Sequence, residues 1–228
     1  MKRLLLLVTI CIFFITFLGC NKVDYQSGCF SVHQQGGFTI ITLNKDSIDF
    51  SVSKEVNSEF DFYINSNYFK KDRKPTCGVI IENEIISKPV KSGGCFVVQD
   101  SKPNIIFDNF NNVEFLSQTH IWLLKNGVSN DNKLKEGHAK KKVCRLLIGK
   151  NNNQNIVVIH SNKYNSVSMR ELTNFAISQG VTDAINLDSG PSVEVFIRNN
   201  EYQYEMKSAP YKPESIKPVI YITGKIKK

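Results

Sequence analysis

The sequence predicts a domain of the α+β class, with a mixed, strand-rich sheet core and one or two packed helices. Many short apolar segments alternate with polar turns, a pattern typical of strands. Only the stretch 168–179 has clear helical periodicity. Because 41% of the 228 residues are hydrophobic and 15 are Phe, the chain can bury a full core. Many strands with few helices favour an antiparallel or mixed sheet.

The expected strands follow one another along the chain, and polar turns join several of them as hairpins. They span 38–43, 48–52, 61–64, 79–81, 84–87, 95–99, 104–107, 121–124, 143–148, 156–160, 184–187, 193–197 and 219–223. Asn126-Gly127 is the strongest two-residue turn signal. Residues 129–142 are polar, so we expect them to be exposed.

The helix at 168–179 is predicted by its two ends and by its apolar face. Ser168 and Glu171 fit the N-cap and third helical position of a capping box. Leu172 and Phe175 fall on one face at helical spacing. Gly180 is a natural end for this helix, because Gly adopts the left-handed conformation without a steric penalty.

The N-terminal residues 1–20 have the pattern of a secretory signal, with Lys2 and Arg3 ahead of an apolar stretch at 4–18. A small residue before Cys20 resembles the bacterial lipoprotein cleavage motif, in which Cys becomes the lipidated first residue. We therefore expect an exported protein of the cell envelope, anchored to the membrane by lipid. Simple secretion and an uncleaved N-terminal anchor remain alternatives.

We expect a tether and lead-in segment at 21–37 and one domain at 38–228. Net charge is +8, and without Lys2 and Arg3 it falls to +6, with 27 basic residues against 21 acidic ones. The surplus is modest, and no basic and aromatic stripe or nucleic-acid motif accompanies it, so no nucleic-acid partner is expected. Walker A, dinucleotide-binding, H-E-x-x-H and G-x-S-x-G patterns are also missing from the sequence.

Four cysteines follow the signal and the proposed lipid site: Cys29, Cys77, Cys95 and Cys144. In an oxidising compartment four cysteines can pair in three ways, and sequence does not choose among them. Disulfides are thus expected, with their pairing open. No C-x-x-C or C-x-x-H spacing suggests a metal site, so no metal ligand and no cofactor is predicted.

A polar loop directly after the apolar strand at 184–187 is the first candidate site. Asp188 stands there beside Asn186, Ser189 and Ser192. A carboxylate at a strand exit can act as general base, nucleophile or ligand anchor. An ordinary polar turn is the alternative.

Two further strand exits carry polar side chains. Asn65 and Asn67 follow one strand, while Gln118, Thr119 and His120 stand just before another. For His120 taken alone, a satisfied polar role is the alternative.

Arg145 is an isolated cation within the apolar strand at 143–148. It either faces solvent by alternation or reaches an anion in a cleft. Arg suits phosphate because its planar fork donates two hydrogen bonds at once.

Taken in order, several motifs resemble the phosphodiester glycosidase family, of which this chain would be a bacterial exported member. The matching segments are Asn65 to Phe69, Gln118 to Gly127, Arg145 to Gly149, Ala184 to Ser192, and Lys217-Pro218-Val219. The resemblance extends over most of residues 38–223. It implies a hydrolase that cleaves a sugar-1-phosphodiester, with a carbohydrate or glycosyl-phosphate as substrate.

The resemblance also implies roles for the candidate residues. Arg145 would bind the phosphate charge, and Asp188 would assist the developing oxocarbenium centre or activate water. The implied substrate-binding residues are Asn65, Asn67, Gln118, Thr119, His120, Asn186, Ser189 and Ser192. A metal requirement stays open.

Several positions depart from the family pattern. Ser66, Asn67 and Ser189 replace glycines, and His120-Ile121 replaces Gly-Pro. Such changes would reshape a pocket, since Gly lets backbone approach a ligand closely. The alternative function is therefore a non-catalytic surface lipoprotein that binds glycan or phosphoglycan, and a third is a structural envelope protein.

Overall fold

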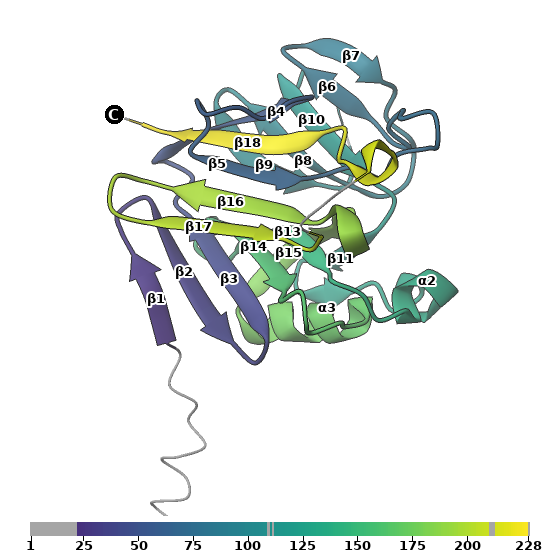
Figure 1. Cartoon of the computed structure of the whole chain (residues 1–228). Coiled ribbons are helices and arrows are strands. Elements are labelled where there is room, and N and C mark those ends of the chain that lie inside the picture. The colour runs from purple at the N-terminus through teal and green to yellow at the C-terminus, as the bar shows by residue number, and fades with distance from the viewer. Residues whose placement is uncertain (1–21, 109, 111, 210–212, 228) are drawn as a thin grey trace, which may run out of the picture.

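The structure is a computed structural model that describes residues 22–108, 110, 112–209 and 213–227. The expected signal segment and Cys20 lie outside the described residues. Within the described part, no helix is long and apolar enough to cross a membrane. Three β-sheets dominate the fold (Figure 1).

The largest sheet has eight strands. In spatial order they are β1 (Lys22–Gln26), β2 (Phe30–Gln35), β3 (Phe38–Leu43), β14 (Ile156–Ser161), β13 (Leu146–Asn151), β15 (Val181–Asn186), β11 (Trp122–Lys125) and β12 (Val128–Ser129). Residues 21–37, the expected tether, thus include β1 and β2. These strands belong to the sheet because Phe30 and Val32 alternate with more exposed residues and enter the core.

Two smaller sheets have five strands each. One is ordered β7 (Glu84–Ser87), β6 (Val79–Ile81), β10 (Phe115–Thr119), β8 (Gly94–Gln99) and β9 (Lys102–Ile106). The other is ordered β17 (Gln203–Lys207), β16 (Glu194–Arg198), β5 (Phe62–Asn65), β18 (Tyr221–Ile226) and β4 (Ile48–Ser53). The paired strands of the described chain are all antiparallel, so the expected mixed sheet is corrected to three antiparallel ones.

Helices are few, as the sequence predicts. The longer is α3 (Met169–Ser178), and the shorter is α2 (Gly137–Lys140). Short 3₁₀ turns occupy Lys133–Lys135, Gly190–Ser192 and Glu214–Ile216. The predicted capping box is confirmed, since Glu171 N–H donates to Ser168 Oγ and Ser168 N–H donates to Glu171 Oε2. Gly180 has φ +73° just past the helix end.

Two cores lie on opposite faces of the eight-stranded sheet. On one face Leu146 and Ile148 of β13 join apolar residues of both five-stranded sheets. On the other face Leu147 joins Leu172 and Ala176 of α3. The alternation along β13 therefore decides which side chains face the other sheets and which face the helix.

Some buried segments are polar in sequence and therefore lack the apolar pattern that predicts a strand. Ser117, Gln118 and Thr119 of β10 are fully buried, so this central strand was not predicted. Within 129–142, Leu134 and Ala139 are buried under α3, so the expectation that this segment is exposed was wrong for these two residues.

The cysteines correct another expectation. Cys29, Cys77, Cys95 and Cys144 are all free thiols, so none of the three possible pairings is present. Cys77, Cys95 and Cys144 are buried, and the Cys144 thiol donates to Ser161 O over 3.3 Å. Desolvation by burial raises the pKa of Cys77 to about 11, which keeps this thiol protonated at neutral pH.

Candidate functional site

Backbone hydrogen bonds bring four chain segments together at one end of strands β13 and β15, which are internal strands of the eight-stranded sheet. Asn186 at the end of β15 pairs with Leu147 of β13, and its N–H donates to Ile121 O over 3.0 Å. Asp188 N–H donates to Ser66 O over 2.8 Å, just beyond the end of β5. The segments after β5 and β15 and before β11 and β13 therefore share one small region.

The buried Asn65 side chain joins two of these segments by hydrogen bonds. Its Nδ2 donates to Asp188 O over 2.8 Å, and its Oδ1 accepts from Glu194 N–H over 2.8 Å. The side chain is fully buried. Because both ends of the amide serve backbone groups, Asn65 positions the Asp188 loop.

Tyr68 is the central side chain of the site, and sequence reasoning did not single it out. Asn186 Nδ2 donates to the Tyr68 hydroxyl. Burial, followed by the charge of the Asp188 carboxylate, raises the pKa of Tyr68 to about 12, while the nearby Arg145 charge opposes this shift. The phenol is therefore protonated at neutral pH and lies among three of the predicted site residues.

Arg145 is buried, with 3% of its surface exposed, which excludes the solvent-facing alternative. Its Nη2 donates to His138 O over 2.7 Å and Lys141 O over 2.6 Å, and its Nε donates to Val167 O over 3.4 Å. Burial lowers the pKa of Arg145, but a guanidinium keeps its charge in proteins. Backbone carbonyls thus hold a buried cation.

Part of the Arg145 guanidinium is not engaged by the described residues. Among the residues that the structure describes, no hydrogen bond engages Nη1 of Arg145, and no carboxylate forms an ion pair with it. Electrostatic coupling links Arg145 to Tyr68, so this charge acts at the site. Such a group is suited to receive an anionic oxygen.

Asp188 lies in the loop between β15 and the Gly190–Ser192 turn and is mostly buried. Its Oδ1 accepts from Ser189 N–H over 2.9 Å. Ser189 Oγ donates to Leu187 O, and Ser192 Oγ donates to Ser189 O. These local bonds fix the loop, so the carboxylate has a set direction rather than the freedom of a surface turn.

Asn186 keeps one buried polar atom without a partner. Its Nδ2 serves both Tyr68 and Leu187 O, whereas its Oδ1 has no hydrogen-bond partner within the described part of the chain. A buried acceptor that no protein group satisfies is costly and is often explained by a bound ligand or water.

Gln118 has a structural environment. Its Oε1 accepts from Gly78 N–H and Val90 N–H, and its Nε2 donates to Val90 O and Ser92 O, at 2.8–3.2 Å. The amide is therefore saturated by the backbone of Gly78 and of the segment that leads to β8.

Asn67 and Thr119 form the same kind of support. Asn67 Nδ2 donates to Gln118 O over 2.8 Å, and its Oδ1 accepts from the hydroxyls of Ser66 and Ser117. Thr119 Oγ1 donates to Ile121 O over 3.3 Å. These bonds connect the segment that precedes Tyr68 to the end of β10, so they support the site.

His120 differs from its neighbours because it is exposed. It precedes Ile121, whose carbonyl accepts from Asn186 N–H, so its backbone lies at the same end of β15 as Asp188.

The structure thus separates the predicted residues into two groups. Arg145, Asn186 and Asp188 gather around Tyr68, whereas Asn65, Asn67, Gln118 and Thr119 support them through backbone contacts. Among the described residues, no group of three or more His, Cys, Asp or Glu is arranged to hold a metal ion. A cation, a carboxylate and a neutral phenol at one end of β15 can bind an anionic group and act on the bond beside it.

Comparison with solved structures identifies proteins with the same fold. One is the catalytic domain of zebrafish N-acetylglucosamine-1-phosphodiester alpha-N-acetylglucosaminidase, described as auto-inhibited by its pro-peptide. It has a TM-score of 0.62 and 14% identity, with 87% of this chain and 78% of that chain covered.

Another is a hypothetical protein from Synechocystis, with a TM-score of 0.62, 12% identity, and 91% of this chain covered. The match spans 61% of that protein's length. At these identities the likeness concerns the fold. No curated protein sequence gives a significant match.

The sequence itself is matched by the profile of the phosphodiester glycosidase family over residues 58–223. This range contains Tyr68, Arg145, Asn186 and Asp188, and it covers well over half of the chain. The chain therefore belongs to the phosphodiester glycosidase family.

Proposed function

We propose that the protein is an exported glycosidase that hydrolyses the bond between a sugar anomeric carbon and a phosphodiester. The observation that carries this proposal is the buried Arg145, whose guanidinium is electrostatically coupled to Tyr68 and, among the described residues, is hydrogen-bonded to backbone carbonyls. Family membership supports the reaction class.

Arg145 is the residue proposed to bind the phosphodiester. The carbonyls of His138, Lys141 and Val167 fix the guanidinium plane but leave its charge unneutralised. In a buried setting such a charge interacts strongly with an anionic oxygen, because little water screens it. Substrate binding thereby places the phosphate, and with it the anomeric carbon, at the site.

Asp188 is proposed to act on the sugar. Its carboxylate would stabilise positive charge at the anomeric carbon or take a proton from the attacking water. In the balanced reaction, the oxygen of water bonds to the anomeric carbon while the bond from that carbon to the bridging oxygen breaks. The phosphate monoester leaves with the bridging oxygen and both bonding electrons, and a proton from water completes the exchange.

Tyr68 is proposed to hold the leaving group. With a pKa of about 12 the phenol keeps its proton at neutral pH and can donate a hydrogen bond to a phosphate oxygen. A phosphate leaving group is already acidic, so a hydrogen bond is sufficient and full proton transfer is unnecessary. Asn186 orients the phenol through its amide.

Two of the departures from the family pattern, Ser66 and Asn67, do not favour the binding-only alternative. Ser66 and Asn67 are buried and hydrogen-bonded among the supporting residues, away from open space. Side chains placed there reinforce the site from behind instead of filling it. The retained Arg145 and Asp188 support hydrolysis.

Hydrolysis in ¹⁸O-labelled water tests this proposal directly. Purified full-length protein is incubated with a panel of sugar-1-phosphodiesters, and the products are analysed by mass spectrometry. The proposal expects the label on the sugar. Label on the phosphate would identify a phosphodiesterase instead, and no turnover with any substrate would reject the enzymatic function.

Export and lipid anchoring at Cys20 also remain proposals, supported by the sequence pattern of residues 1–20. Mass spectrometry of the protein from a bacterial membrane fraction is expected to give an N-terminal diacylglyceryl cysteine. Cys20→Ala should abolish this modification, and an unmodified N-terminus in the wild-type protein would contradict the proposal.

A further inference from the structure

A cleft lies at the ends of β13 and β15 that are opposite to the candidate active site. It has a volume of about 720 Å³ and is bordered by the β8–β9 hairpin and by the turns after β11 and β13. Lys150 and Asp183 line it, whereas Tyr68, Arg145, Asn186 and Asp188 do not. The cleft is therefore separate from the candidate active site.

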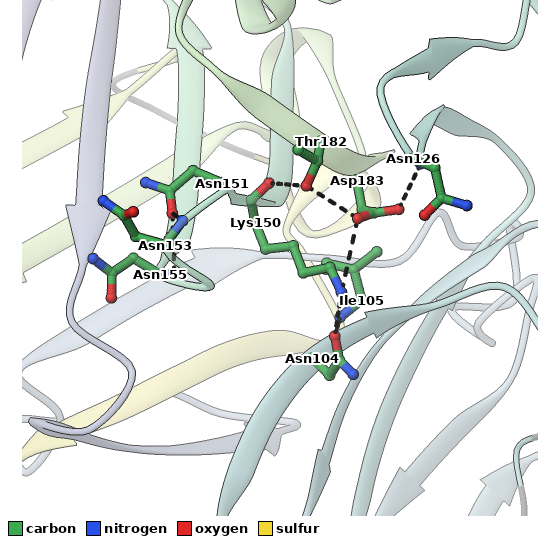
Figure 2. Close-up of polar contacts among 9 residues, drawn as sticks. All are labelled: Asn104, Ile105, Asn126, Lys150, Asn151, Asn153, Asn155, Thr182 and Asp183. Atoms are coloured by element: carbon green, nitrogen blue, oxygen red, sulfur yellow. Dashed lines mark hydrogen bonds and ion pairs between the residues drawn. The ribbon is translucent and has the colours of Figure 1, made fainter.

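Lys150 crosses from the eight-stranded sheet toward β9 at this cleft (Figure 2). Its Nζ donates to Asn104 Oδ1 over 3.1 Å and lies 3.7 Å from Asp183 Oδ2. The lysine side chain is only 18% exposed. An ammonium has three donors, so this group can still donate to a molecule in the cleft.

Asp183 is held more firmly than a surface carboxylate. Its Oδ1 accepts from Asn126 N–H over 3.0 Å, and its Oδ2 accepts from Thr182 Oγ1 over 3.1 Å (Figure 2). The carboxylate is 8% exposed. These fixed bonds place a carboxylate and an ammonium side by side without side-chain rearrangement.

The remaining lining combines groups of opposite hydrogen-bonding character. Four lysines and three aspartates line the cleft together with four side-chain amides and apolar residues of β8 and β9. Nearly balanced charge does not select a strong anion or cation. Paired donors and acceptors beside apolar surface match the alternating hydroxyl and C–H faces of a sugar.

We infer that this cleft is a second binding site, which takes a neutral saccharide. Neighbouring hydroxyls would accept from Lys150 Nζ and donate to Asp183, while Asn104 Nδ2 provides a further donor. The inference stands on the cleft alone and does not depend on catalysis at Asp188. The competing interpretation is that Lys150 only ties β13 to β9 as a structural brace.

Titration of the ¹⁵N-labelled full-length protein with maltotriose, mannotriose and chitotriose tests the inference by NMR. At least one is expected to bind with a dissociation constant on the order of 1 mM. The shifted amides should surround Asn104, Lys150 and Asp183. The same titration of Asp188→Asn is expected to give the same shifts, which separates this site from the proposed active site.

Two variants and their matched controls complete the test. Lys150→Met keeps the apolar stem and should weaken binding about tenfold or more, whereas Asn104→Ala, at an exposed position, should weaken it severalfold. Lys225→Met changes a strand lysine paired with Glu59, and Asn152→Ala changes an exposed turn residue outside the lining. Both controls should bind like the wild-type protein.

Any of the following outcomes would overturn the inference. One is the absence of binding by all three sugars at about 20 mM, well above the expected constant. Another is shifts confined to the region of Asp188. A third is unchanged binding in folded Asn104→Ala and Lys150→Met proteins, or preferential binding of inorganic phosphate at the cleft.

Discussion

A cation and a carboxylate are present near each end of β15, in different arrangements. At one end Asp183 lies 3.7 Å from Lys150 and the pair borders an open cleft. At the other end the charges of Arg145 and Asp188 both act on Tyr68, but the hydrogen bonds of the Arg145 side chain go to backbone carbonyls. Lys150 of β13 is neutralised by Asp183 of the neighbouring strand β15. No carboxylate of the described residues forms an ion pair with Arg145, so its charge can act on a ligand.

This difference separates binding from catalysis. A fixed pair of opposite charges suits neutral hydroxyl groups, while a buried guanidinium held by carbonyls suits a phosphodiester.

Arg145→Ala should have a large effect on activity. We expect the kcat/KM for sugar-1-phosphodiesters to fall about 10²–10³-fold, because the phosphate loses its buried positive partner. Arg145→Lys should restore only part of the activity, since an ammonium cannot reproduce the planar fork. Steady-state kinetics measure this, and near-normal activity in folded Arg145→Ala would place phosphate binding elsewhere.

His160 reports how well water is excluded from the buried face of β14 that contacts Tyr204. It is fully buried, its Nε2 lies 2.9 Å from the Tyr204 hydroxyl, and burial lowers its pKa to about 4. Between pH 6.5 and pH 4, His160 is therefore protonated in the unfolded state and neutral in the folded state. Stability should be greatest above pH 6.5 and fall by about 3 kcal/mol toward pH 4.

Urea denaturation between pH 7 and pH 4 measures this dependence. His160→Gln should remove most of the decrease in the free energy of unfolding between pH 7 and pH 4. An identical slope in wild-type and variant proteins would mean that His160 is hydrated or protonated in the folded state.

Tyr68→Phe should have a moderate effect. Loss of the hydroxyl removes one hydrogen bond to the leaving group, so kcat/KM should fall about tenfold. The loss should be smaller for substrates with a more acidic leaving group, a trend that a purely structural role would not produce. Kinetics with a series of aryl phosphodiesters of graded acidity measure this trend.

Lys150→Met should have the smallest effect on stability. Asp183 keeps its bonds to Asn126 N–H and Thr182 Oγ1, so the loss should be about 1 kcal/mol. Denaturant unfolding measures it, with Lys225→Met as the matched control. A loss of about 4 kcal/mol would identify the pair as a structural brace and remove the contrast.

The parts of the fold predicted from sequence depend on local signals. The capping box at Ser168 and Glu171 fixes the start of α3, and the apolar run 38–43 coincides with β3. Strand β10 was not predicted, because its buried Ser117 and Gln118 resemble a polar loop in sequence. Their burial depends on partners far along the chain.

The site shows the same limit. Family motifs identify Arg145 and Asp188, but whether an isolated Arg in a strand faces solvent or core depends on the carbonyls around it. Tyr68 carries no distinctive signal, since most tyrosines are ordinary core or surface residues. Its place within the Asn65 to Phe69 motif was the only available hint. The Lys150–Asp183 pair joins two strands and has no local pattern at all.

The most direct test of the account compares kcat/KM for a sugar-1-phosphodiester in Asp188→Asn and Asp61→Asn. Asp61 is a matched control, because it also accepts a backbone N–H, from Ile226 over 3.0 Å, but lies away from both sites. We predict a loss of about 10³-fold or more for Asp188→Asn and less than about threefold for Asp61→Asn. Equal activity of the two folded variants would contradict the assignment of Asp188 to the active centre.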